Sequence, residues 1–177
     1  MHLFADIAFC TARNLESWKT MFPNPSTSPA HYAKTLAIEP PHIVTAADTE
    51  AGEWIRVFSS VVQLEVNEDP RMSVFKSKVP LLPFHGISPV VKSLRLQRIV
   101  IPCSLVFNLI LSFPLLEDVS LFARDVSIND GDDSDWPPAV VHPSGPPMLT
   151  GSLELSLSEG VGDIMLRLVF LPGGIYP

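Results

Sequence analysis

The chain has 177 residues, 46% of them hydrophobic and 18% charged, which suits one folded domain and excludes a wholly disordered chain. Its net charge of −7 argues against a nucleic-acid or acidic-membrane binder, since either needs a basic face, and leaves a basic protein partner open. Two cysteines, Cys10 and Cys103, are too few and too far apart for a disulfide framework or a zinc site.

An h-x-x-h-x-h signature, in which h is apolar or in one case threonine, recurs six times along the chain. The middle residues are separated by 29, 28, 30, 25 and 34 residues. A period of this size is typical of a solenoid in which strand-plus-helix units stack on one another. The six signatures are Phe4/Ile7/Phe9, Ala33/Leu36/Ile38, Val61/Leu64/Val66, Val91/Leu94/Leu96, Leu116/Val119/Leu121 and Thr150/Leu153/Leu155.

Each signature predicts a short strand with alternating sides, because residues two apart in a strand point the same way. Around residue 94, for example, Leu94 and Leu96 are expected to point inward and Ser93, Arg95 and Gln97 outward. Parallel strands covered on both faces would be continuous apolar runs instead. The predicted fold is therefore α/β, an irregular leucine-rich-repeat solenoid fragment with a curved parallel sheet, one wet face, and helices on the convex side.

Helical spacing of apolar residues predicts helices at 14–22, 49–58, 104–113 and 162–170. Polar loops are expected at 23–29 and at 129–147, the second being an insertion rich in Asp, Ser, Gly and Pro, and a loop with room for a helical turn at 74–83. Residues 99–116 carry no charge, but Pro102 and Pro114 interrupt the segment, so no transmembrane helix is predicted. Residues 1–177 are read as a single domain of about six strand units.

The outward strand positions are the predicted partner-binding residues, because solenoids bind through their concave sheet. An ordinary solvated face is the open alternative. The outward positions of the six predicted strands form two rows, to which the first two strands contribute Asp6, Thr35, Ala8 and Ala37. The two rows together contain four acidic residues and one basic residue, so a basic peptide is the expected partner. The predicted partner-binding positions are Gln63, Glu65, Ser93, Arg95, Asp118, Ser120, Ser152 and Glu154.

No constellation in the sequence predicts catalytic, cofactor-binding or metal-binding residues. The acidic run at 130–135 does not follow the calcium-loop spacing, and its twelfth position is Val141 rather than glutamate. Gly160 and Gly162 lack the rest of a phosphate loop, and the five histidines are scattered. A non-enzymatic protein is therefore predicted, with an α/β enzyme of unknown reaction as the competing hypothesis.

Several segments resemble the repeats of mushroom-type F-box-like proteins of basidiomycete fungi. Residues 113–121, read FPLLEDVSL, are similar to a strand start in those leucine-rich repeats, and residues 83–89, 146–155 and 171–175 are similar to other segments of the family. The resemblance implies a substrate-recognition module of a ubiquitin ligase. Residues 1–5 are similar to the junction that follows the F-box, so the F-box that binds a Skp-type adaptor is expected to be missing.

The two ends of the chain also lack the polar caps that solenoids need, which predicts truncation at both ends. A truncated gene product without independent function is therefore a further alternative. Asp6 lies among the first apolar residues and no basic region precedes them, so no signal peptide is expected, and an intracellular location, cytoplasmic or nuclear, is predicted.

Overall fold

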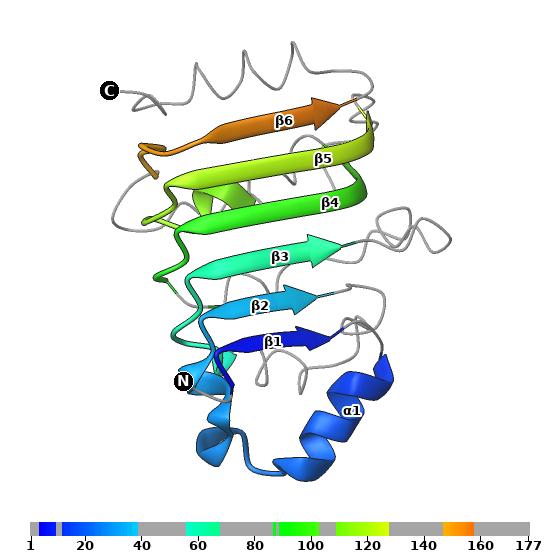
Figure 1. Ribbon diagram of the computed structural model, residues 1–177, viewed down its shortest axis with the longest axis vertical. Helices are drawn as coiled ribbons and strands as arrows, with labels where there is room; N and C mark the ends of the chain where they lie inside the picture. Colours follow the sequence, from blue (N-terminus) through cyan, green and yellow to red (C-terminus); the bar gives the residue numbers. More distant parts are fainter. Residues whose placement is uncertain are drawn as a thin grey trace, which may run out of the picture.

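The structure is a computed structural model of the chain and describes residues 4–9, 12–38, 56–67, 87, 89–102, 109–127 and 147–157. Figure 1 shows six strands stacked one above the other, with α1 below the first strand. The elements in chain order are β1 (Asp6–Phe9), α1 (Ala12–Met21), the 3₁₀ helices η1 (Pro25–Thr27) and η2 (Pro29–Tyr32), β2 (Thr35–Ile38), β3 (Gln63–Asn67), β4 (Ser93–Pro102), β5 (Asp118–Ser127) and β6 (Leu153–Leu157).

The six strands form one sheet in which every pair is parallel and the spatial order follows the chain order. The middle residues of the signatures meet in register, so that one line runs across all six strands. That line contains Ile7, Leu36, Leu64, Leu94, Val119 and Leu153. The predicted stacking of the signatures is confirmed, and an all-parallel sheet with few helices agrees with the predicted α/β class.

The core lies on one face of the sheet and includes two such lines. In β2 to β5 the inward residues of these two lines are at most 2% exposed. Val61 and Val91, the first residues of the third and fourth signatures, are fully buried as well. Burying one aliphatic side chain of this kind stabilises a fold by roughly 1.5–3 kcal/mol. The second line contains Phe9, Ile38, Val66, Leu96, Leu121 and Leu155.

One position of the last signature was predicted wrongly. Thr150 is exposed, and Leu149, one residue earlier, is 1% exposed and joins the core cluster. A leucine gains more free energy than a threonine on burial, because the threonine hydroxyl would need a hydrogen-bond partner inside the core. The chain therefore reaches β6 with a spacing one residue longer than in the other signatures.

A repeated backbone contact joins each strand to the next at the point where the strand begins. The carbonyl of Ala5 accepts hydrogen bonds from the amides of Lys34 and Thr35, and the carbonyl of Lys34 accepts from Val62 and Gln63. The carbonyls of Val62 and Lys92 do the same for β4 and β5. We call these four contacts the two-donor joints. They fix the register without using any side chain.

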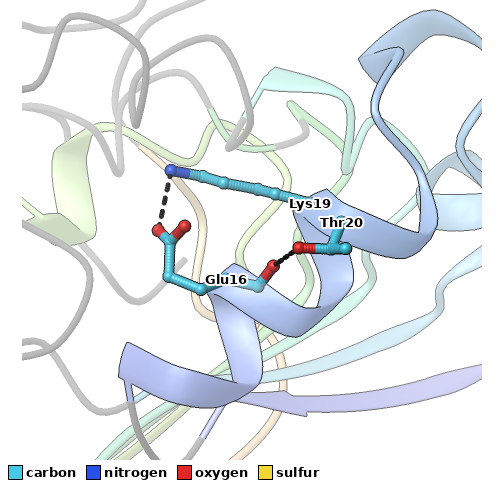
Figure 2. A network of polar contacts seen from close by, with 3 residues as sticks. All are labelled: Glu16, Lys19 and Thr20. Carbon is cyan, nitrogen blue, oxygen red and sulfur yellow. Dashed lines mark hydrogen bonds and ion pairs between the residues drawn. The ribbon is translucent and has the colours of Figure 1, made fainter.

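The predicted helix at 14–22 is confirmed as α1, which ends just before Pro23 because proline cannot continue a helix. Its outer surface carries a small polar network (Figure 2). Lys19 Nζ lies 3.2 Å from Glu16 Oε1, and Thr20 Oγ1 donates to the Glu16 carbonyl at 2.8 Å. The Glu16 side chain is well exposed and that of Lys19 largely covered, and a helix pair at this spacing contributes at most about 0.5 kcal/mol to helix stability.

The inner side of α1 closes an aromatic cluster beneath β1. Trp18 packs edge-on against Phe4 and Phe9, with ring centroids 6.0 and 5.9 Å apart, and lies 4.6 Å from Phe22. Phe58, which precedes β3, contacts Phe9 from the other side at 5.9 Å. The aromatic rings of the described core are thus concentrated near the first strands, and Phe113, before β5, is a buried ring further along the sheet.

The polar segment predicted as a loop at 23–29 contains regular structure. Asn24 caps η1 through Oδ1, which accepts from the Ser26 amide at 3.0 Å, and the buried Ser28 caps η2 through Oγ, which accepts from the Ala30 amide at 3.2 Å. A proline starts each turn. Asn and Ser at cap positions and proline at the first position are residues that begin helical turns. Because the same residue types are common in loops, the composition of this segment did not distinguish the two turns from a loop.

Strands β4 and β5 are each ten residues long, well beyond the predicted strands, and their pairing shifts register on both sides of Ile99. Residues 109–111 of the predicted 104–113 helix are helical and buried. Only residues 56–58 of the helix predicted at 49–58 are described, with Arg56 helical. The predicted helix at 162–170, the loop at 74–83 and all of the 129–147 insertion except Pro147 lie outside the described residues.

Candidate functional site

The eight predicted partner-binding residues lie in two neighbouring rows across β3 to β6. In the second row, Glu65 pairs in register with Arg95, Arg95 with Ser120, and Ser120 with Glu154. In the first row Gln63, Ser93 and Asp118 are paired, and Ser152 lies against Asp118. All eight are at least partly exposed, while the residues between them in β3 to β5 are buried. We call the sheet face formed by these rows the polar face.

A third row was not among the predicted partner-binding residues, although Gln97 was expected to point outward. Asn67, Gln97, Phe122 and Ser156 align in register one step further along the strands, and all are at least partly exposed. The same two-residue period would have found them, since each lies two positions after a predicted residue. Phe122 is the one large apolar side chain among these four.

Arg95 makes a contact with that third row. Its guanidinium carbon lies 5.9 Å from the centre of the Phe122 ring, within the range of a cation–π interaction. In register Arg95 lies opposite Glu65, yet the two side chains form no ion pair in the described residues. The only cation in the three rows is therefore engaged by a ring and does not neutralise the neighbouring carboxylate.

Two carboxylates of the polar face are bound by neutral partners. Glu65 Oε1 accepts a hydrogen bond from Asn67 Nδ2 at 2.9 Å, and Glu154 Oε2 accepts from Ser120 Oγ at 3.3 Å. Within the part of the chain that the structure describes, neither carboxylate contacts a cation. Both therefore keep their negative charge available for a guest.

Asp118 has the most structured environment on the polar face. Its Oδ1 accepts from the Ser152 amide at 2.6 Å and from Ser152 Oγ at 2.8 Å. These hydrogen bonds, the backbone one first, hold the pKa of the Asp118 carboxyl below its usual 3.8, and slight burial opposes them weakly. The carboxylate also takes the place of one acceptor contact in what would be a fifth two-donor joint. The Glu117 carbonyl accepts from the Gly151 amide, and the Ser152 amide donates to Asp118 Oδ1 instead.

Gly151 is required for that arrangement. A Cβ at this position would lie 2.8 Å from Asp118 Cγ and would overlap its Oδ1. Any larger residue would push the carboxylate away from the Ser152 amide. The glycine is thus explained by the close approach of a side chain from the neighbouring strand.

An ion pair lies at the border of the polar face. Lys92 Nζ is 2.6 Å from Glu117 Oε1, and both side chains are nearly half exposed. The two residues precede adjacent strands and are also joined by the backbone, since the Glu117 amide donates to the Lys92 carbonyl. Lys92, which directly precedes the row residue Ser93, is therefore paired with an acid of its own.

The described residues offer a surface for binding and contain no group of three or more His, Cys, Asp or Glu side chains that could hold a metal ion. Across the same ranges, no helix is long and apolar enough to cross a membrane. His31, on η2, bonds through Nδ1 to the Ser28 carbonyl at 2.7 Å and does not belong to the polar face. The acidic run at 130–135 lies outside the described residues.

Comparison with models of known families, with curated proteins and with solved structures gave no match for this chain. Its function must be inferred from the geometry of its own residues.

Proposed function

We propose that the chain is a non-catalytic protein-binding module whose partner lies across the polar face. The observation that carries this proposal is the in-register exposure of Gln63, Ser93, Asp118 and their neighbours on one side of a sheet whose other side is continuously apolar. A parallel sheet is ordinarily covered on both faces. An uncovered one presents a broad, ordered array of side chains, which suits recognition of another protein.

The proposed fold behind this surface is the irregular leucine-rich-repeat solenoid, with the polar face on its concave side. The in-order parallel strands and the 25–34 residue steps between the stacked signatures support it. The resemblance to mushroom-type F-box-like proteins supports the same role, that of the repeats that recognise a substrate protein.

We infer that the partner is a basic segment. Asp6, Glu65, Asp118 and Glu154 place four acids on the rows against one basic residue, Arg95. Among the described residues Glu65 and Glu154 have neutral partners only, and Arg95 lies over a ring. A cationic guest gains favourable electrostatic energy at both glutamates without having to displace a resident cation.

The spacing of the two glutamates sharpens the inference. Glu65 and Glu154 lie on β3 and β6, three strand intervals apart, which corresponds to about 14 Å at the usual strand spacing. An extended peptide advances about 3.3 Å per residue, so side chains four positions apart are separated by nearly the same distance. A peptide that crosses the strands can therefore place basic residues at positions one and five over the two carboxylates.

The test uses two synthetic peptides of equal length and charge, one with lysines four positions apart and one with lysines two positions apart. We expect the first to bind more tightly, and its affinity to fall as salt is raised. The double variant Glu65→Gln/Glu154→Gln should abolish the preference. The single variants Glu65→Gln and Glu154→Gln should each weaken the preference, and their charge-matched control Glu16→Gln, on α1 and away from the rows, should retain it.

Equal binding of both peptides, or an equal loss in the control variant, would show that net charge alone attracts the guest and would contradict the proposed face. Tighter binding of a glutamate-containing peptide would contradict the inferred sign of the partner.

A further inference from the structure

A hollow of about 440 Å³ lies between β1 and α1. Its wall includes every residue of β1, and it also includes Phe4 and one side of α1: Asn14, Ser17, Trp18 and Met21. Successive strand residues point to opposite faces. A hollow that touches four consecutive residues must therefore run beside the strand, as a groove between α1 and the edge of β1 that pairs with no described strand. In Figure 1, α1 lies on that side of β1, away from β2.

The backbone of β1 leaves four polar groups on that edge. Ala5 directs its carbonyl toward β2, where the Lys34 and Thr35 amides donate to it. Peptide groups alternate in direction along a strand, so Asp6 and Ala8 point both their amides and their carbonyls away from β2. In the described residues β1 pairs with β2 alone. The groove is thus lined by two N–H donors and two C=O acceptors at strand spacing.

The side chains around the groove differ between its two sides. On the core side stand Ile7, Phe9 and Trp18, which are at most 8% exposed, whereas Asp6 and Ala8 are exposed on the other. Trp18 is 7% exposed, and its Nε1 has no hydrogen-bond partner in the described part of the chain. A buried donor without an acceptor is unfavourable, and an oxygen of a bound molecule would satisfy it.

We propose that this groove binds an extended peptide segment of a partner protein, which adds to the sheet as a parallel strand beside β1. The backbone groups of Asp6 and Ala8 pair with the segment, as in other cases of strand addition. Apolar side chains at alternate positions of the segment face Phe9 and Trp18, and a basic or polar side chain faces Asp6. The site is separate from β3 to β6, so it does not depend on the function proposed for the polar face.

The probe is an acetylated and amidated peptide with the sequence of residues 91–97, Val-Lys-Ser-Leu-Arg-Leu-Gln. In the sheet this sequence already turns its leucines to the core and its serine and arginine outward, as the groove requires. We expect saturable binding by calorimetry. On binding, hydrogen exchange of the Asp6 and Ala8 amides should slow, while the Ile7 and Phe9 amides, which face β2, should not change.

Two modified peptides test the pairing without any change in the protein. In a parallel strand placed before β1, the leucine amides face β1 and the serine and arginine amides face away. N-methylation of the two leucine amides should therefore abolish binding, whereas N-methylation of the serine and arginine amides should leave it nearly unchanged.

Two protein variants complete the test. Ala8→Pro removes one outward amide and keeps the bonds to β2, a substitution that edge strands tolerate, and should weaken binding about tenfold or more. Trp18→Phe removes the indole donor and keeps a ring, and should weaken binding roughly two- to tenfold.

Absence of binding, an inverted N-methylation pattern, or exchange protection outside β1 would overturn the proposal. Protection of Asp6 and Ala8 that rises with protein concentration in the absence of peptide would overturn the assignment to a partner and identify a second copy of this chain as the occupant.

Discussion

The two ends of the sheet are closed by different kinds of interaction. At the first end, Phe9 is 3% exposed and is held by the Trp18 and Phe58 rings. At the other, Leu155 of β6 is only partly buried, and a carboxylate replaces part of the two-donor joint. The first end therefore depends on burial of apolar surface, and the last on short polar contacts. Loss of a side chain should have unequal effects at the two ends.

The largest difference is expected from truncation of the paired core residues. Phe9→Ala should lower the free energy of unfolding by about 3–5 kcal/mol, because it leaves a cavity inside a ring cluster. Leu155→Ala should cost about 1–2 kcal/mol, since part of that side chain already contacts water. Urea denaturation of the two variants measures both values. Equal losses would show that the two ends are packed alike.

A smaller effect is expected at Gly151. Gly151→Ala forces the Asp118 carboxylate aside and should cost about 1–3 kcal/mol, the usual range for overpacking. In an Asp118→Ala background the added methyl group meets no carboxylate, so the same substitution should cost much less. A double-mutant cycle measures the difference. An additive result would mean that the glycine is needed for a reason other than this close approach.

The smallest effect is a pH dependence confined to the last joint. Because folding lowers the pKa of Asp118 below 3.8, its stabilising contribution is fully present above the unfolded pKa. The contribution is lost as the pH falls from about 4 through the folded value. Unfolding of the wild type and Asp118→Asn, compared between pH 6 and pH 3, should show a shallower decline in the variant. Identical slopes would exclude Asp118 as a source of acid sensitivity.

The repeating part of the fold could be predicted from the sequence because it depends on the period of apolar residues alone. The line through Leu36, Leu64 and Leu94, and the rows of Glu65 and Arg95, follow from a two-residue period inside steps of similar length. Stacked parallel strands translate such a pattern directly into neighbours in space. The in-register alignment of the signatures and of the outward strand positions was predicted correctly for this reason.

The other features of the fold and site depend on contacts between particular side chains, and the spacing of apolar residues in the sequence does not specify these contacts. The extension of β4 through Ile99 requires two register shifts, and the contact of Asp118 with Ser152 requires that a glycine stand beside them. The groove beside β1 depends on where α1 docks, which is decided by the fit of Trp18 among three phenylalanines. Such features emerge from packing, which a pattern of residue types does not specify.

The two-donor joints have a consequence for how the surface can change. Because backbone carbonyls and buried apolar residues align these strands, their outward side chains are not needed to set the register. Substitutions at these outward positions can therefore change the shape and charge of the polar face while the strands stay in the same alignment. The last joint is different, because there the Asp118 side chain accepts the hydrogen bond that a backbone carbonyl accepts at the other joints. A substitution of Asp118 is therefore expected to weaken the attachment of β6.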